Sequence, residues 1–429
     1  AMSTIEKHDM TQGKILLPLV SFTIPLVLGN LFQLTYNAAD SVIVGKYVGE
    51  QALAAVGTST PIMNIAILLI SGMCMGASVL MSSQYGAKDY DTLSRQISTT
   101  MLAGCGFSVV FSLLMLLLAN PVLRLIRVPE TAIPEAAAYL RIIFMGLIFT
   151  FMYNFLANTM RALGDSKTPL YFLVTSAFLN IFGDLFFVVV LRWGVAGSAI
   201  ATVCSEGLCC LLCGIYIKKK IPLLCLGKKW WVFDKSLLGK TVSYGSTSAM
   251  QQVCLQLGKL IIQSVVNTQG VAVMAAFTAV NRVDDFAYTP QQNIGHAMTT
   301  FLAQNKGAGH KERMKKGFQT GLLIELVYSI GLFCVIWGLA PQIMTLFAED
   351  GDAQVVSLGI SYLHLISWMY ILPGLTNGVQ GFFRGIGDLK VTLYSTFMNM
   401  FGRVVAVFVM IRLLQICLLY TSPSPRDCS

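Results

Sequence analysis

The 429-residue sequence has few charged residues, and this shortage excludes a soluble globular protein. Only 12% of its residues are Asp, Glu, Lys or Arg, whereas 55% are hydrophobic and the mean hydropathy is +0.68. Soluble domains carry about 25% charged residues. Apolar segments of about 20 residues, long enough to cross ~30 Å of hydrocarbon, recur along the chain. The composition therefore predicts an all-α protein that crosses a membrane many times.

The sequence also lacks the short motifs of several enzyme classes. It has no Walker phosphate-binding loop, no HExxH helix, no GxSxG turn and no dinucleotide-binding glycine pattern. Its eleven cysteines fall mostly within apolar segments and lack paired CxxC spacing, so we expect reduced, buried cysteines that pack as small apolar side chains. We therefore expect no enzyme activity, no cofactor and no metal centre, apart from a coupling ion.

Eleven apolar segments are predicted to be membrane helices. Their expected bounds are 15–37, 52–81, 96–118, 136–158, 168–191, 195–217, 236–266, 271–303, 317–340, 355–383 and 391–415. Several contain an internal proline, such as Pro25, where a membrane helix can kink or hinge. The polar start of the chain and the length of the first apolar segment predict that no signal peptide is cleaved.

The sequence repeats itself after about 220 residues. Residues 161–171 (RALGDSKTPLY) recur 223 positions later as 384–394 (RGIGDLKVTLY), with six identical positions. This duplication predicts two parallel six-helix bundles in two lobes, related by an axis along the membrane normal. We expect a first lobe at 1–217, a cytoplasmic connection at 218–235 and a second lobe at 236–415. The second lobe lacks a twelfth apolar segment, and residues 416–429 (ICLLYTSPSPRDCS) are expected to be a non-native tail.

The distribution of Lys and Arg predicts the orientation. If the N-terminus is cytoplasmic, the inside segments hold 20 of these residues, and the outside loops hold four: Lys46, Arg124, Arg127 and Arg192. This bias follows the positive-inside rule, so we expect a multi-pass cell-membrane protein with a cytoplasmic N-terminus. The net charge of +9 then faces membrane lipid rather than nucleic acid.

Asp40 and Asp184 are the most informative ionisable residues within the apolar segments. A charge at mid-bilayer costs at least ~2.5–3.5 kcal/mol. Asp40 closes the first segment and shares a helical face with Tyr36 and Asn37, while Asp184 shares one with Asn180. Two desolvated carboxylates close together cannot readily both ionise, so the pair would form a proton relay or a Na⁺ site. The alternative is a carboxylate that only caps a helix end.

Other polar residues of the first half could line the same interior: Tyr139, Asn154, Asn158 and Thr202. The second half is not a copy in this respect. Ile261 stands at the position of Asp40, and Arg403 at the position of Asn180. We therefore expect the ion chemistry in the first lobe.

The duplicated RxxGDxK motif is interpreted as a cytoplasmic clasp. In each copy the aspartate could neutralise the arginine or the lysine, and the glycine permits a tight turn before the next helix. The residues of this clasp are Arg161, Asp165, Arg384 and Asp388. A motif present in both halves suits a structural or gating role better than substrate binding.

Several stretches resemble the multidrug and toxic compound extrusion (MATE) transporters. They are 39–57 (ADSVIVGKYVGEQALAAVG), 83–89 (SQYGAKD), 161–170 and 384–390, and the resemblance extends from about Thr11 to Leu414. It implies a V-shaped, monomeric twelve-helix exporter of drug-like compounds, driven by inward flow of H⁺ or Na⁺. It is similar to the prokaryotic branch with an essential aspartate near the end of helix one. That role maps onto Asp40, and the branch's supporting network maps onto Tyr139, Asn180, Asp184 and Thr202.

The resemblance implies alternating access. A proton or Na⁺ would bind at Asp40 and Asp184, and the first helix would then bend near Pro25 and expel an amphipathic, often cationic, compound. Two alternatives stay open. The first is a lipid-linked oligosaccharide flippase of the same superfamily, which would need a larger cationic cavity. The second is an integral membrane enzyme.

Overall fold

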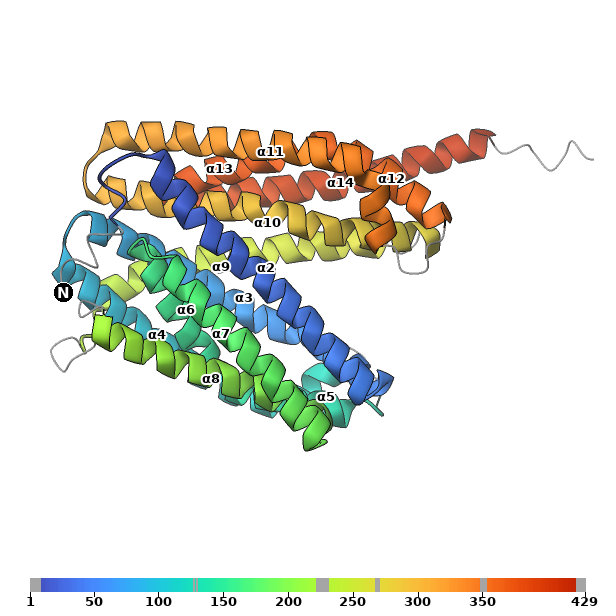
Figure 1. Ribbon diagram of the computed structural model, residues 1–429, viewed down its shortest axis with the longest axis horizontal. Coiled ribbons are helices and arrows are strands. Elements are labelled where there is room, and N and C mark those ends of the chain that lie inside the picture. The colour runs from blue at the N-terminus through green and yellow to red at the C-terminus, as the bar shows by residue number, and fades with distance from the viewer. Residues whose placement is uncertain are drawn as a thin grey trace, which may run out of the picture.

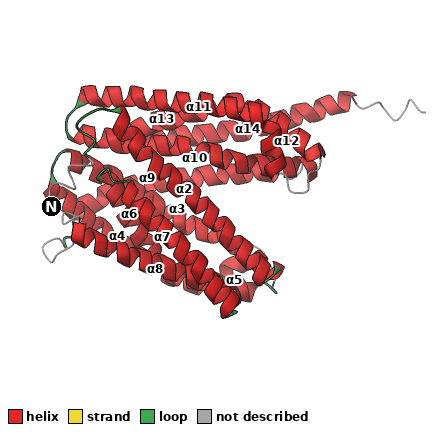
Figure 2. Cartoon of the chain, in the orientation of Figure 1, coloured by secondary structure: helices red, strands yellow, loops and turns green. Residues whose placement is uncertain are grey.

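The computed structural model describes residues 9–125, 128, 130–220, 231–266, 271–347 and 353–421. Every regular element in these ranges is a helix (Figures 1 and 2). The first half contains α2 (Leu16–Tyr47), α3 (Glu50–Gly86), α4 (Tyr90–Leu125), α5 (Ile133–Met145), α6 (Leu147–Ala162), α7 (Lys167–Asp184), the π-helix η1 (Leu185–Val190) and α8 (Gly194–Lys220). The second half contains α9 (Lys235–Val266), α10 (Val271–Gly307), α11 (Lys311–Phe347), α12 (Ala353–Ser367), the short η5 (Trp368–Tyr370), α13 (Ile371–Gly385) and α14 (Leu389–Thr421).

Eight of the described helical spans are long and apolar enough to cross a membrane. A ninth is obtained when α5 and α6, which bend by 47° at Gly146, are taken as one span. The expected spans 236–266 and 271–303 form α9 and α10 but are more polar than the others. Several of their polar side chains are buried in protein, among them Thr241 and Gln251 on α9 and Gln291 on α10. Packing inside the molecule therefore explains how these two helices tolerate their polarity.

The ends of α2 and α14 differ from the sequence-based expectation. α2 continues to Tyr47, past the expected end at residue 37, so Asp40 lies inside the helix instead of closing it. α14 continues to Thr421, so the tail expected from residue 416 begins within a helix, and residues 422–429 lie outside the described residues. Most of the expected connection 218–235 also lies outside them, at 221–230.

The helices form two bundles that touch at one end and diverge toward the other (Figure 1). One bundle holds α3 to α8, the other holds α9 to α14, and α2 runs across from the second to the first. The N-terminal part of α2 packs Leu19, Phe22 and Leu26 against Ile294 and Met298 of α10. Its C-terminal part packs against α7. Both bundles therefore contact α2 along its length, and α9 likewise packs against α3 and α4 of the first bundle and α14 of the second.

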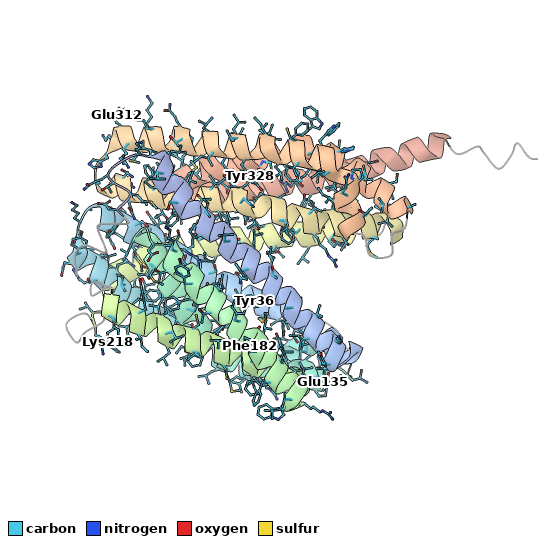
Figure 3. All side chains as sticks on the ribbon, viewed as in Figure 1. Tyr36, Glu135, Phe182, Lys218, Glu312 and Tyr328 are labelled. Atoms are coloured by element: carbon cyan, nitrogen blue, oxygen red, sulfur yellow. The ribbon has the colours of Figure 1, made fainter. Side chains whose placement is uncertain are left out.

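Small residues bring the two bundles into backbone contact at the closed end. A Cβ atom on Gly76 of α3 would lie 2.5 Å from the backbone nitrogen of Gly245 on α9, and one on Gly72 would lie 2.5 Å from the Cα atom of Ala249. No side chain larger than hydrogen fits these positions without displacing α9. Figure 3 shows Lys218 and Glu312 at this closed end, whereas Glu135 lies at the open end.

The outer surface of the bundles is apolar, as lipid requires. Large side chains such as Leu117 and Leu125 on α4 and Val327 on α11 are more than half exposed. The eight described cysteines are free thiols, in agreement with the expected reduced state. Two of them, Cys204 and Cys334, are exposed instead of buried and therefore belong to this outer surface.

Candidate functional site

Three helices of the first lobe bring together a cluster of carboxyl and hydroxyl groups. Asp40 comes from α2, Asp184 ends α7, and Ser198 lies near the start of α8. The Ser198 hydroxyl donates a hydrogen bond to Oδ1 of Asp40 over 2.8 Å, and the Asp184 carboxyl lies beside both groups. The two aspartates predicted from sequence are therefore neighbours, although 144 positions separate them in the chain.

The environment of Asp184 is unusual for a carboxyl group. The residue is completely buried, and among the described residues neither of its carboxyl oxygens has a hydrogen-bond partner of suitable geometry. The π-helix Leu185–Val190 begins directly after it, and such widened turns occur frequently at functional sites. A buried carboxyl without donors can accept a proton or a small cation, because either one supplies the missing interaction.

Asn180 and Thr202 extend this cluster along α7 and α8. Nδ2 of Asn180 donates to Oγ1 of Thr202 over 3.1 Å, and the Thr202 hydroxyl lies 3.1 Å from the backbone oxygen of Ser198. Oδ1 of Asn180 is buried without a donor. The i, i+4 spacing places Asn180 above Asp184 on the same face. The structure thus leaves further oxygen atoms available next to the carboxyl pair.

Tyr139 and Tyr36 complete the cluster from α5 and α2. Tyr139 is buried and lies within electrostatic reach of Asp40, Asp184 and Glu206. Tyr36, labelled in Figure 3, lies near Asp40 and Glu206. All five residues expected to bind the ion therefore meet in one place: Asp40, Asp184, Asn180, Tyr139 and Thr202.

Ser198 and Glu206 are members of the cluster that the sequence-based site did not include. They lie on α8 at positions i and i+8, with Thr202 halfway between them, so one face of this helix is polar. Glu206 accepts a hydrogen bond from the Thr150 hydroxyl, which lies just after the bend between α5 and α6. The four-residue spacing around Thr202 is the sequence signal that could have identified both residues.

The remaining supporting residues occupy different positions. The side-chain amides of Asn154 and Asn158 donate to backbone oxygens within α6, at Thr150 and Asn154. Asn37 lies on α2 and is exposed. The hydrogen bonds of Asn154 and Asn158 therefore link them to their own helix rather than to the carboxyl pair.

The twin RxxGDxK motifs form tight turns, as expected, but their charged groups are arranged differently. Gly164 and Gly387 have φ angles of +89° and +86°, which favour glycine. Asp165 accepts hydrogen bonds from the backbone nitrogens of Lys167 and Thr168, each over 3.0 Å, and from the Thr168 hydroxyl over 2.6 Å. Asp165 thus caps α7.

The arginines of these motifs are not paired with the aspartates among the described residues. The ion pairs found there are Arg95–Asp234, Arg124–Glu130 and Lys259–Asp285. Instead, Nε of Arg161 and Nε of Arg384 are buried without hydrogen-bond partners, and both guanidinium groups lie near His296. The expected neutralisation of arginine by aspartate within each motif is therefore wrong for Arg161 and Arg384.

Among the described residues of the second lobe, Glu325 on α11 has a fully buried carboxyl group. Neither of its oxygens has a hydrogen-bond partner among those residues, and Oε2 would lie 3.3 Å from a Cβ atom placed on Gly374 of α13. Asp284 accepts a hydrogen bond from the Tyr370 hydroxyl, and Asp285 pairs with Lys259 over 3.3 Å. Each of these two acids therefore has a partner of its own, unlike Asp184 of the first lobe.

Comparison with known proteins agrees with this arrangement. The MatE family model matches twice, over residues 25–186 and 248–409, and the two matches are displaced by 223 positions. The chain is 32% identical over 392 residues to the probable multidrug resistance protein YpnP of Bacillus subtilis, covering 91% of this chain and 86% of that protein. It is 23% identical over 411 residues to the probable multidrug resistance protein NorM of Thermotoga maritima, covering 94% of this chain and 87% of that protein.

The fold is also similar to solved structures. A structure described as the outward-facing conformation of a multidrug resistance MATE family transporter matches with a TM-score of 0.86 at 22% identity, covering 94% of this chain and 90% of that one. A structure of MATE in the bent conformation matches with a TM-score of 0.84 at 23% identity, covering 90% of this chain and 86% of that one. The duplicated family match and the shared fold show that this chain is a multi-pass membrane protein that belongs to the MATE family of transporters.

Proposed function

We propose that this protein is a secondary active multidrug efflux antiporter, which exports amphipathic, often cationic, compounds in exchange for H⁺ or Na⁺. The observation that carries the proposal is the contact between Asp40 and Asp184 inside the first lobe. The Ser198 hydroxyl donates to Asp40, and the neighbouring Asp184 carboxyl has no hydrogen-bond partner among the described residues. Such a pair binds a proton or Na⁺ strongly, because either one removes the repulsion between the carboxylates.

The cluster connects ion binding to the movement of α2. Asp40 lies on the part of α2 that packs against α7, whereas Pro25 lies on the part that packs against α10. Proline lacks the N–H that would bond the preceding turn, so α2 bends there at little cost. When the ion neutralises the pair, the Asp40 end of α2 approaches α7 and α8 and closes the space that the exported compound occupies.

Coupling requires that the ion and the exported compound favour different states of the same lobe. The carboxyls of Asp40, Asp184 and Glu206 attract a cationic compound while they are ionised. Neutralisation removes that attraction. The names of the relatives, which describe probable multidrug resistance proteins, support export of drug-like compounds. In this proposal the protein works as a monomer with a cytoplasmic N-terminus, and the bundles diverge toward the outside.

The proposal can be tested with purified protein in proteoliposomes. A pH gradient and then a Na⁺ gradient would be imposed, and the movement of a fluorescent cationic dye would be followed. Movement driven by one gradient would identify the ion, and Asp40→Asn should abolish that movement. Gradient-driven dye movement that persists unchanged in Asp40→Asn would overturn the assignment of the ion to the first lobe.

The alternative of a lipid-linked oligosaccharide flippase calls for a large cationic cavity. The second lobe does contain a pocket lined by Arg384 and Arg403, but its interior volume is only about 40 Å³. An oligosaccharide does not fit in this space, so this pocket does not supply the cavity that a flippase needs. Transfer of a labelled lipid-linked sugar in the same proteoliposomes, without any movement of dye, would support the flippase instead.

A further inference from the structure

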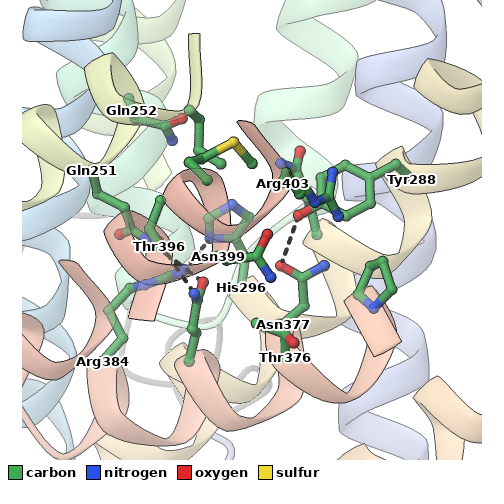
Figure 4. Close-up of a pocket in the computed structure, with 16 residues that line it drawn as sticks. Gln251, Gln252, Tyr288, His296, Thr376, Asn377, Arg384, Thr396, Asn399 and Arg403 are labelled. Atoms are coloured by element: carbon green, nitrogen blue, oxygen red, sulfur yellow. Dashed lines mark hydrogen bonds between the residues drawn. The ribbon is translucent and has the colours of Figure 1, made fainter. Parts of the chain in front are cut away.

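A polar pocket lies inside the second lobe, between α9, α10, α13 and α14 (Figure 4). None of its 16 described lining residues is Asp or Glu, whereas Arg384 and Arg403 are both among them. Its interior volume of about 40 Å³ exceeds the roughly 10–15 Å³ that one water molecule needs. The pocket therefore has room for a small charged group and has positively charged walls.

Arg384 is the buried cation of this pocket. Only 6% of the residue is exposed, and its Nη1 lies 3.2 Å from Nδ1 of His296, which must accept because arginine can only donate (Figure 4). Nε of Arg384 has no hydrogen-bond partner. A guanidinium group that is buried without an anion carries a large desolvation cost. The environment of Arg384 is thus incomplete without an acceptor.

Asn377 presents a second unused donor in the same pocket. It is 7% exposed, and its Oδ1 accepts a hydrogen bond from the Tyr288 hydroxyl over 3.5 Å, while its Nδ2 has no partner. Both buried side-chain atoms that lack a partner in this pocket are therefore N–H donors. A ligand that satisfies both must bring acceptor oxygens, not a positive charge.

The neighbouring amides hold the pocket in shape instead of competing for the ligand. Nε2 of Gln251 donates to Oε1 of Gln380 over 3.2 Å and to the Thr396 hydroxyl over 3.0 Å (Figure 4). Leu255, Pro373 and Met400 supply an apolar part of the lining. The pocket thus offers fixed donors next to an apolar surface, which suits the head group of an amphiphile.

The internal duplication shows that the two lobes differ in charge at matching positions. Where the first lobe has Asn180 beside the carboxyl pair, the second has Arg403, and Ile261 stands at the position of Asp40. A cation site in one lobe is therefore matched by a cationic pocket in the other.

We propose that this second-lobe pocket binds the carboxylate or phosphate head of an anionic or zwitterionic amphiphile. Nε and Nη2 lie on one edge of a guanidinium group, so a head group that meets Nε of Arg384 accepts two parallel hydrogen bonds. Nδ2 of Asn377 donates a third. The site goes beyond the proposed ion-coupled export, because it lies in the other lobe and involves none of the ion-binding residues.

Calorimetric binding to the purified full-length chain, in a neutral detergent, tests this site. The probes are dodecanoate, dodecyl phosphate and the cationic dodecyltrimethylammonium. Arg384→Gln should weaken the binding of dodecanoate or dodecyl phosphate at least tenfold and leave the cationic probe within twofold. Arg384→Lys keeps the charge but cannot donate two parallel hydrogen bonds to one head group, so it should give an intermediate loss of affinity for the anionic probes. Arg141→Gln, which removes an exposed arginine in the first lobe, should change nothing.

Unchanged binding of both anionic probes to a folded Arg384→Gln variant would overturn the proposal, as would an equal loss in Arg141→Gln. If Arg384→Gln does not fold, Asn377→Leu replaces it in the test. We then expect a three- to tenfold loss of affinity for the anionic probes, and an unchanged affinity would contradict the proposed site. Displacement of dodecanoate by phosphatidylglycerol would identify a lipid head group as the natural ligand, and failure to displace it would identify a soluble amphiphile. Because binding is measured instead of transport, the result does not depend on the proposed export function.

Discussion

Asp184 is the residue of the first-lobe cluster that is most completely removed from water and from hydrogen-bond donors. We expect Asp184→Asn to abolish the ion dependence of export, because an amide is not protonated between pH 5 and pH 9 and offers Na⁺ no negative charge. The free energy of unfolding should fall by no more than about 1 kcal/mol, and it could also rise, since the variant buries no charge at this position. Gradient-driven dye efflux and thermal unfolding would measure the two effects.

The control is Asp91→Asn, which changes an exposed carboxyl at the start of α4 in the same way. It should leave efflux at the wild-type level. Wild-type ion dependence in Asp184→Asn would show that the carboxyl pair is not the ion site.

The sequence predicted part of this cluster, for a clear physical reason. The spacing of Asn180 and Asp184 shows that they share a helical face, and their polarity within an apolar segment shows that this face is turned away from lipid. Spacing along one helix cannot show which other helix adjoins it. The spacing of Ser198 and Glu206 around Thr202 marks a polar face of α8, but only the packing of α8 beside α2 and α6 shows that Ser198 bonds Asp40 and Glu206 bonds Thr150.

At the scale of the helices, substitutions of Asp165 in the turn before α7 can distinguish helix capping from ion pairing. We expect Asp165→Ala to lower the free energy of unfolding by roughly 1–2 kcal/mol, because the backbone nitrogens of Lys167 and Thr168 lose their acceptor. Asp165→Asn keeps an acceptor oxygen and should cost far less, since asparagine caps helices about as well as aspartate. Chemical unfolding of both variants in detergent makes the comparison. Equal losses would favour a charge-based clasp over a cap.

The first helix offers a second test at this scale. Pro25→Ala restores an N–H donor within α2, and alanine is favoured over proline by about 3 kcal/mol inside a helix. We therefore expect greater thermal stability together with slower dye efflux, because bending α2 becomes more costly.

Pro61→Ala is the matched control, since Pro61 is an exposed internal proline of α3. It should stabilise the protein without slowing efflux. Equal efflux in Pro25→Ala and the wild type would exclude a hinge at Pro25.

Most helices were predicted from their apolar segments, but the ends of α2 and α14 were not. Apolarity marks where a helix crosses hydrocarbon, and a helix can continue beyond it as long as its backbone hydrogen bonds continue. The bend of 47° between α5 and α6 also escaped prediction, because it occurs at Gly146 and not at a proline. The segments at 236–266 and 271–303 were predicted from their apolar residues and do form the helices α9 and α10, although both are more polar than the other spans.

At the scale of the whole molecule, backbone contact between α3 and α9 holds the bundles together at one end. Gly76→Ala places a Cβ atom 2.5 Å from the backbone of Gly245, so we expect a loss of about 1–3 kcal/mol in the free energy of unfolding. Gly106→Ala is the matched control, because no neighbouring atom lies within 4 Å of its Cβ position. It should be neutral or stabilising. Thermal unfolding of the two variants gives the result, and equal stability would contradict this packing.

The duplication predicted two lobes, and it could not predict that they would differ so strongly in charge. The first lobe holds the adjoining Asp40 and Asp184, whereas the second holds the buried Arg384 without an anion. Which side chains are buried, and which of their polar atoms lack hydrogen-bond partners, depends on how the helices pack, and the sequence repeat alone does not specify that packing.

Competition between the ion and the exported compound is the most direct test of the central claim. The affinity of the purified protein for a cationic dye would be measured from pH 5 to pH 9 and from zero to high Na⁺, in the wild type and in Asp40→Asn. We predict that the wild-type affinity falls at least tenfold as H⁺ or Na⁺ rises, because the ion neutralises the carboxyl pair that attracts the dye. Asp40→Asn should lose this dependence. A wild-type affinity that stays constant across both series would contradict the account.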